Sequence, residues 1–388
     1  MKAAILREVL DGETRVALVP ETVRRLEKLA LEIVVEAGAG EKAYITDADY
    51  QAAGAHVQAD AEKLLAEADL VLKVNPPADG GSAGRNELAM LKAGTILVAI
   101  LQPSVNLPLV RRLAEGNITS FALDAIPRIT RGQSMDVLSS MSMLAGYKAA
   151  LLAAGTLSKI TPMMMTAAGT FPPAKAVVIG AGVAGLQAIA TLRRLGVIVK
   201  AVDTRPAVKE ETETLGAQFI TLEVEHTQAQ DAGGYAMDLG EDFYKQEQDI
   251  LAPHVQEADV VISTALIPNR RAPLLISEQM VSQMKPGAVI VDLAAAGGGN
   301  CTLSQPDQRV VRNNVTIIAP LNLSAKLPVH ASQMFSRNIA TFVAEFVKDG
   351  QVQLDMENEI IAGCMITHQG KITHEATLKA IESGEVKP

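Results

Sequence analysis

Apolar and polar stretches alternate in a regular order along the first 125 residues. The runs KAAILREV and LEIVVEAG are typical of buried strands, and PETVRRLEKLA between them has helical spacing. Pro20 opens this helical segment, in keeping with the preference of proline for a first helical turn. The alternation continues from TDADYQAAG to ITSFALDA. Strands that alternate with helices predict parallel pairing in an open, doubly wound sheet.

A long helical pattern and a proline-bounded segment follow. The spacing of apolar residues from Gln133 to about Lys159 predicts one helix that leaves a first domain and enters a second. The segment PMMMTAAGTFPPA has proline near both ends and is predicted to be a linker. We expect its three methionines to be packing residues, because methionine fills irregular gaps in protein interiors.

A second alternating block runs from AKAVVIG to VTIIAP. The polar residues 223–243 interrupt it without a clear period, which indicates a functional or disordered loop. After about residue 326 a helical pattern precedes a polar tail, which we expect to return to the first domain. We therefore predict an α/β protein with two doubly wound, Rossmann-like domains joined by long helices. The first domain is discontinuous, residues 1–133 plus 326–388, and the second comprises residues 134–325.

Composition removes several classes of function. Aromatic residues make up 3% of the chain and there is no tryptophan, so stacking platforms for single-stranded nucleic acid are not expected. A net charge of -9 argues against nucleic acid or an anionic membrane surface as a partner. Cys301 and Cys364 have no metal-ligand spacing, so no metal site is predicted. We also expect no signal peptide and no membrane span.

The second block opens with a glycine-rich turn between a predicted strand and a predicted helix. Gly180, Gly182 and Gly185 fit the pattern G-x-G-x-x-G, which permits a tight turn, close approach of a pyrophosphate and close packing of helix and strand. Asp203 ends the next strand at the spacing expected of a ribose-binding acid. A carboxylate there favours NAD, although Arg205 nearby could receive the 2′-phosphate of NADP. The alternative is a structural turn without a ligand.

A second concentration of polar residues, RITRGQSMDVLSS, lies between two apolar regions at residues 128–140. It offers hydrogen-bonding groups but none whose ordinary pKa is near neutrality. None of the six histidines lies at the end of a predicted strand facing the glycine-rich turn. The segment therefore suits positioning of a ligand better than proton transfer. The alternative is that Asp136 or Ser134 only caps the long helix.

These segments, together with DAGGYAMDLGEDF, STALIPNRRAPLLI and VDLAAAGGGNC, closely resemble the NAD(H)-binding component, domain I, of proton-translocating nicotinamide nucleotide transhydrogenases. The resemblance covers nearly the whole chain. It implies that NAD(H) binds here, that NADP(H) binds on a partner domain, and that a membrane-spanning partner carries protons. Hydride then passes directly between two nicotinamide rings. The resemblance also implies a homodimer that is cytoplasmic and peripheral to the inner membrane through its partner subunits.

The resemblance implies a role for each matching residue, with the nucleotide in the cleft between the domains. The nicotinamide ring and its ribose are assigned to Arg128, Gln133, Asp136 and Ser139. The pyrophosphate is assigned to Gly180, Gly182, Val183 and Gly185. The adenosine ribose is assigned to Asp203, with Thr204 and Arg205 nearby. Ala265 and Leu266 would border the adenine side, and Tyr235 would close over the bound nucleotide as part of a mobile loop.

Two other functions remain open at this point. Alanine dehydrogenase is similar in its N-terminal stretch, including Arg15, but Asn75 and Gln102 stand where that family has its lysine and histidine. A non-catalytic NAD(H)-sensing module would need the glycine-rich turn but not the loop at 128–140. The chain also departs from the transhydrogenase pattern at Lys326 and Ala296, which leaves open the contacts that these two positions make in the family.

Overall fold

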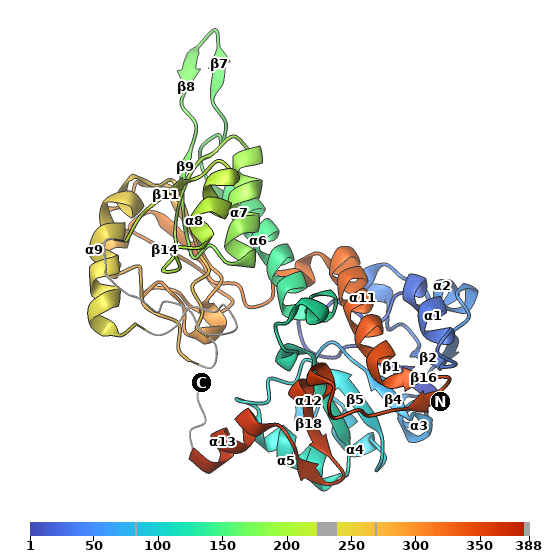
Figure 1. Ribbon diagram of the computed structural model, residues 1–388. Coiled ribbons are helices and arrows are strands. Elements are labelled where there is room, and N and C mark those ends of the chain that lie inside the picture. Colours follow the sequence, from blue (N-terminus) through green and yellow to red (C-terminus); the bar gives the residue numbers. More distant parts are fainter. Residues whose placement is uncertain (82–83, 223–238, 268–269, 384–388) are drawn as a thin grey trace. The chain divides into compact units, whose positions relative to one another are not determined.

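The computed structural model describes residues 1–81, 84–222, 239–267 and 270–383 (Figure 1). By its internal packing the chain divides into two units. Unit 1 contains residues 1–141 and the described residues after 324, and unit 2 contains the described residues of 142–324. The chain crosses inside α6 (Val137–Thr156) and returns at the 3-10 turn η6 (Ser324–Lys326). The domain limits at 133/134 and 325/326 stay a prediction, because a division by packing does not test independent folding.

Unit 1 is built on an eight-stranded sheet with the order β19-β18-β6-β5-β4-β1-β2-β3. The strands from β3 to β6 are parallel: β1 (Lys2–Ile5), β2 (Glu32–Glu36), β3 (His56–Gln58), β4 (Leu70–Leu72), β5 (Ile96–Ala99) and β6 (Thr119–Ala122). The helices between them are α1 (Pro20–Glu27), α2 (Asp47–Ala52), α3 (Ala61–Glu67), α4 (Glu87–Met90) and α5 (Leu107–Glu115). All residues of β4, β5 and β6 are buried, as expected for parallel strands covered on both faces.

The C-terminal part of the chain completes unit 1. Its elements are α11 (Pro328–Phe346), β16 (Val347–Lys348), β17 (Gln351–Val352), α12 (Glu359–Cys364), β18 (Met365–His368), β19 (Lys371–Ile372) and α13 (Glu375–Ser383). Strand β18 pairs antiparallel with β6 at the edge of the sheet. The prediction that this end returns to the first domain is therefore confirmed.

Unit 2 is built on a seven-stranded sheet with the order β11-β10-β9-β12-β13-β15-β14. Its strands are β9 (Lys175–Ile179), β10 (Ile198–Val202), β11 (Gln218–Phe219), β12 (Val260–Ser263), β13 (Val289–Asp292), β14 (Arg309–Arg312) and β15 (Val315–Ile318). All neighbours are parallel except β14 and β15. The helices are α7 (Val183–Arg194), α8 (Val208–Thr214), α9 (Glu241–Glu257) and α10 (Glu278–Gln283). The predicted pair of doubly wound sheets is confirmed.

Helix α6 is apolar along most of its length. Among the helices of the described residues, it is the one long and apolar enough to cross a membrane by length and composition. A core helix of a soluble protein can have the same length and apolar composition. Ala149, Ala150 and Ala153 are fully buried in the core of unit 2. This packing accounts for the apolar residues on that part of α6.

The segment predicted to be a linker is a β-hairpin. Strands β7 (Met164–Thr166) and β8 (Gly169–Phe171) pair antiparallel, and Figure 1 shows them standing away from the rest of unit 2. Every residue of both strands is exposed, and Met165 is 76% exposed. The prediction that these methionines pack inside the chain is therefore wrong for the single chain.

Candidate functional site

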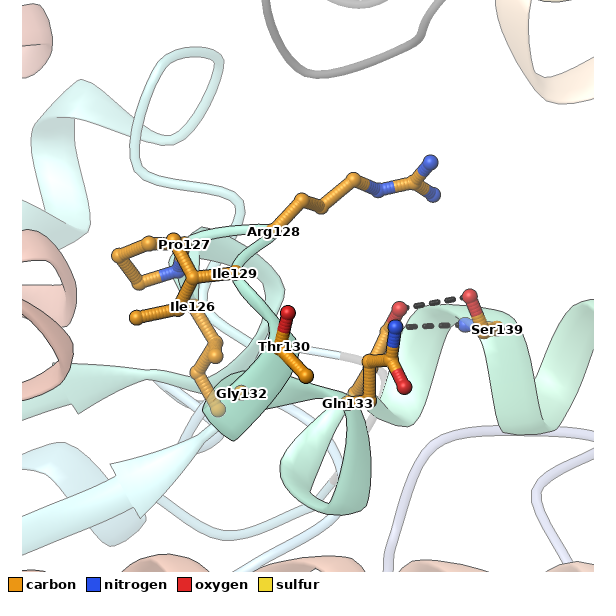
Figure 2. Close-up of a pocket in the computed structure, with 9 residues that line it drawn as sticks. Ile126, Pro127, Arg128, Ile129, Thr130, Gly132, Gln133 and Ser139 are labelled. Atoms are coloured by element: carbon orange, nitrogen blue, oxygen red, sulfur yellow. Dashed lines mark hydrogen bonds between the residues drawn. The ribbon is translucent and has the colours of Figure 1, made fainter.

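The polar loop of unit 1 lines a pocket of about 480 Å³ (Figure 2). The loop joins β6 to α6 through the 3-10 turns η3 (Leu123–Ala125) and η4 (Thr130–Met135). The pocket is lined by Ile126, Pro127, Arg128, Ile129, Thr130, Gly132, Gln133, Asp136 and Ser139. The four loop residues assigned to the nicotinamide end of the nucleotide, Arg128, Gln133, Asp136 and Ser139, are thus brought together around one cavity.

Asp136 and Ser139 are held by each other at the start of α6. The Asp136 carboxylate accepts from the Ser139 amide at 2.8 Å and from the Ser139 hydroxyl at 2.6 Å, and Figure 2 marks both bonds. Asp136 therefore caps the helix, as the alternative explanation of this segment required, and lines the pocket as well. The Arg128 and Gln133 side chains are exposed. In Figure 2, Arg128 extends away from the loop backbone.

The chemistry of the pocket is that of hydrogen bonding. None of the nine described residues that line it is a histidine, lysine, cysteine or tyrosine. Its one carboxylate, that of Asp136, is occupied by the helix cap. Arg131 is turned elsewhere, because its Nη2 atom donates to Glu345 and Asn358. The pocket can hold an amide or a hydroxyl group, but its described residues lack a side chain suited to general-base catalysis at neutral pH.

The glycine-rich turn of unit 2 joins β9 to α7. Gly180 has a φ of +90°, which a residue with a side chain rarely adopts. A Cβ atom on Gly185 would lie 1.9 Å from the Gly180 carbonyl oxygen, so packing of the turn itself excludes a side chain there. On Gly182 the nearest atom would be Arg205 Nη2 at 3.8 Å, an ordinary contact. Gly182 is thus not required by the packing of the chain, which fits a position kept bare for a ligand.

Asp203 follows β10 and faces the glycine-rich turn. Its carboxylate accepts from the Ala181 amide at 2.8 Å. It also accepts from the backbone amide, Nε and Nη2 of Arg205, each at 2.9 Å. This ion pair raises the pKa of Arg205. Because the Asp203 side chain is 6% exposed and already accepts these four bonds, a ribose hydroxyl would have to share or replace the Arg205 contacts.

The remaining assigned residues of unit 2 lie shortly after its strands or at the start of α7. Thr204 is half-buried beside Asp203, and Val183 is the exposed first residue of α7. Ala265 follows β12, and Leu266 is exposed. Asn300 fixes the Ala265 backbone, since its Oδ1 accepts from the Ala265 amide at 3.0 Å and its Nδ2 donates to the Ala265 carbonyl at 2.9 Å. Tyr235 lies outside the described residues.

Two residues near these strand ends were not identified from the sequence. Asn300 is fully buried, but nothing in the run GGGNC indicates that its side chain bonds to the backbone of another segment. Glu247 is 3% exposed on the buried face of α9, in line with Phe243, Leu251 and Val255. Burial, reinforced by repulsion from Asp203, raises the pKa of Glu247 to about 7. A glutamate within a stripe of apolar residues spaced four apart is a signal that the sequence does contain.

The residues that bear on an alanine dehydrogenase lie in unit 1. Arg15 is buried and donates from Nε and Nη2 to the Glu13 carboxylate at 2.8 and 2.6 Å. Asn75 donates to Glu13 and Glu8 at 2.9 and 3.2 Å. Gln102 is exposed after β5, with a φ of +49°. Arg15 is therefore already paired with a carboxylate of its own chain.

The two positions that depart from the transhydrogenase pattern are both exposed. Lys326 ends η6, and Ala296 lies in the 3-10 turn η5 (Ala295–Gly297) that follows β13. Their contacts with a nucleotide or a partner stay untested.

Two family models match consecutive parts of the chain. The alanine dehydrogenase/PNT N-terminal domain matches residues 4–145, and the alanine dehydrogenase/PNT C-terminal domain matches residues 149–375. The junction between them falls within α6.

Similar proteins span nearly the full length of the chain. It is 45% identical over 379 residues to the first part of the NAD(P) transhydrogenase alpha subunit of Rhodospirillum rubrum, with coverage of 97% of this chain and 98% of that protein. It is 30% identical to the alanine dehydrogenase of Halomonas elongata, with coverage of 98% and 96%. A solved transhydrogenase structure from Sinorhizobium meliloti has a TM-score of 0.84 at 39% identity, with coverage of 97% and 100%. The chain belongs to the alanine dehydrogenase/PNT family.

Proposed function

We propose that this chain is the NAD(H)-binding subunit of a proton-translocating NAD(P) transhydrogenase. Hydride passes directly between NADH bound here and NADP+ bound on a partner domain. A membrane-spanning partner couples this transfer to proton translocation. The observation that carries the proposal is the pocket of unit 1, whose described lining consists of hydrogen-bonding and apolar groups without a suitable general base.

The reaction explains why such a pocket suffices. Oxidation of an alcohol or an amine removes a proton as well as a hydride and needs a base within reach. Transfer between two nicotinamide rings releases no proton at the reacting carbons. The remaining requirement is to hold the two rings near contact distance, about 3–3.5 Å. We assign the nicotinamide ring and its ribose to Arg128, Gln133, Asp136 and Ser139.

The glycine-rich turn of unit 2 and its neighbours would serve the pyrophosphate and adenosine of NAD(H). The bare position at Gly182 and the first turn of α7 suit the pyrophosphate, with Gly180, Val183 and Gly185 around it. Asp203 would accept from the adenosine ribose, with Arg205 released in part from its ion pair. Thr204, Ala265 and Leu266 would border the adenosine. We propose NAD(H) as the nucleotide, because Asp203 disfavours a 2′-phosphate.

The partners follow from the same proposal. The chain would act as a homodimer and would bind NADP(H)-binding and membrane-spanning subunits, at the cytoplasmic face of the inner membrane. The similar protein of Rhodospirillum rubrum is itself named as a portion of a subunit. The exposed apolar side chains of the hairpin, Met163, Met164, Met165 and Phe171, are a candidate contact surface for such partners.

The test is hydride transfer from NADH to an NADP+ analogue, with the purified chain alone and with the purified NADP(H)-binding partner. Transfer in the mixture and none with either protein alone is the expected result. An alanine dehydrogenase would instead oxidise NADH by itself with pyruvate and ammonia. That result, together with no transfer in the mixture, would overturn the proposal. High-affinity NADH binding without either activity would favour the sensing module.

A further inference from the structure

Asn338, a buried residue of helix α11, bonds to the pocket loop of unit 1 at two points. The Asn338 Nδ2 atom donates to the Ser134 carbonyl oxygen at 2.8 Å. Its Oδ1 atom accepts from the Ser140 hydroxyl, also at 2.8 Å. Asn338 itself is 7% exposed, Ser140 is half-buried, and Ser134 lies at the surface. One amide therefore joins the end of η4 to the first turn of α6.

The two attachment points enclose the functional part of the loop. Asp136 and Ser139 lie between Ser134 and Ser140, and Gln133 directly precedes Ser134. Along this part of the loop, the Asp136 amide donates to the Gln133 carbonyl at 3.3 Å, and the Ser140 amide donates to the Asp136 carbonyl at 3.2 Å. The distance between Gln133 and the helix cap is thus set by bonds inside the loop and by the amide of Asn338 across its ends.

A second set of contacts holds the earlier part of the same loop. Arg131 donates to Glu345 on α11 at 3.1 Å, and Asn358 donates to that same carboxylate oxygen at 3.0 Å. These side chains are more exposed than Asn338, and the Arg131 side chain is 60% exposed. Since an exposed ion pair contributes little stability, the buried amide is the stronger attachment.

We infer that Asn338 is a positioning residue for hydride transfer, which acts through Ser134 and Ser140 to place Gln133, Asp136 and Ser139 in the pocket. This inference rests on the proposed function and extends it to a residue outside the pocket lining. A displacement of about 1 Å in a reacting geometry can cost about 100-fold in rate. Loss of this clamp, the two hydrogen bonds of Asn338 to Ser134 and Ser140, is therefore expected to lower the rate of hydride transfer much more than the affinity for NADH.

The experiment compares the full chain with three variants in the presence of the NADP(H)-binding partner. Asn338→Ala removes both bonds, and Ser140→Ala removes one of them. Ser336→Ala is the matched control, because Ser336 is a buried residue of α11 that bonds to the Val19 amide and to Thr22, away from the loop. For each protein we would measure the rate of transfer, the Kd for NADH and the hydrogen exchange of peptides covering residues 132–140.

The expected result for Asn338→Ala is a rate of transfer reduced about 10- to 100-fold, with a Kd for NADH within about threefold of the unsubstituted chain. Exchange within residues 132–140 should rise in this variant and in Ser140→Ala, but not in Ser336→Ala. If Asn338→Ala does not fold, Ser140→Ala carries the test, with a smaller loss of rate.

Three outcomes would count against the inference. Unchanged exchange in the loop would show that Asn338 does not clamp it. Faster exchange with an unchanged rate of transfer would show that the clamp does not position the reacting groups. An equal loss of rate in Ser336→Ala would assign the effect to general stability. If the unsubstituted chain transfers no hydride, the proposed function fails, and the exchange measurement still decides whether Asn338 holds the loop.

Discussion

The two units share one sheet topology but differ in the residues at the ends of their central strands. Their parallel strands follow the orders β3-β2-β1-β4-β5-β6 and β11-β10-β9-β12-β13-β15. In each, a carboxylate at the end of the second strand accepts from the amide two residues after the first strand. Glu36 accepts from Arg7 at 2.8 Å in unit 1, and Asp203 accepts from Ala181 at 2.8 Å in unit 2. Each carboxylate is also paired with an arginine, Arg85 or Arg205.

The two units differ in the connection between the first strand and the first helix. In unit 2, α7 begins at Val183, directly after Gly182, so its N-terminal amides lie next to the turn. In unit 1, α1 begins only at Pro20, and a longer connection follows β1. The space beside β1 and β4 is filled by a buried network in which Lys73 pairs with Glu8 and Glu87.

This comparison teaches that a doubly wound sheet provides a place for a ligand, while side chains decide whether the place is open. Ligands of such sheets bind where the strand order reverses. The glycines of unit 2 leave that place bare, and the charged side chains of unit 1 fill it. Function in this chain therefore depends on the residues at the strand ends and not on the shared fold.

The sharpest test of the open site is Gly185→Ala. A Cβ atom 1.9 Å from the Gly180 carbonyl cannot be accommodated without moving backbone, so we expect the free energy of unfolding to fall by about 3 kcal/mol. Gly182→Ala should change that free energy by less than about 0.5 kcal/mol but weaken NADH binding at least tenfold. Denaturant unfolding and NADH titration measure both. Equal destabilisation by the two substitutions would contradict the view that Gly185 is required for packing and Gly182 for approach of a ligand.

Buried carboxyl groups in the two units should respond to pH with opposite sign. Although burial opposes it, Arg15 holds the pKa of Glu13 at about 2, so the contribution of Glu13 to stability is lost as pH falls below about 4.5. Burial raises the pKa of Glu247 from 4.5 to about 7, so its contribution is complete below 4.5 and lost as pH rises through 7. Glutamine does not titrate. The free energy of unfolding of Glu247→Gln, relative to that of the unsubstituted chain, should therefore rise by up to about 3 kcal/mol between pH 4 and pH 8. Urea unfolding at both pH values checks this, and a pH-independent difference would contradict it.

Removal of the corresponding carboxylates, Asp203 in unit 2 and Glu36 in unit 1, should distinguish an effect on NADH affinity from an effect on stability. Asp203→Ala is expected to weaken NADH binding by roughly 1–3 kcal/mol, because a ribose hydroxyl loses its acceptor. Glu36→Ala removes the corresponding carboxylate of unit 1 and should lower thermal stability while leaving the Kd for NADH within a few-fold. Calorimetric titration of both variants makes the comparison. Unchanged NADH affinity in Asp203→Ala would remove this residue from the site.

The smallest expected effect belongs to Gln133→Asn in the pocket loop. The shortened side chain keeps its amide but withdraws it, so hydride transfer should slow by about tenfold while NADH affinity stays within a few-fold. Single-turnover transfer and equilibrium titration distinguish the two quantities. A loss of NADH binding with an unchanged transfer step would show that Gln133 anchors the nucleotide and does not position its ring.

Much of the fold followed from local pattern. Alternation of strands and helices predicted both parallel sheets, because buried parallel strands read as continuous apolar runs. The glycine spacing at 180–185 predicted the turn between β9 and α7, since backbone geometry and close packing demand glycine there. The concentration of polar residues at 128–140 predicted the pocket-lining loop. The hairpin at residues 164–171 was missed, because prolines at its edges suggested a linker and its exposed methionines suggested burial.

The sequence alone thus determined the class of fold, the glycine-rich turn and the residues of the loop, since each depends on neighbours within a few positions. Tertiary structure alone decided which polar groups are available to a ligand. Arg85 pairs with Glu36 across 49 positions, Asn300 fixes the backbone of Ala265 across 35 positions, and Asn338 fastens the loop through Ser134 across 204 positions. The partner of a hydrogen bond is set by distance in space, and no local spacing encodes it.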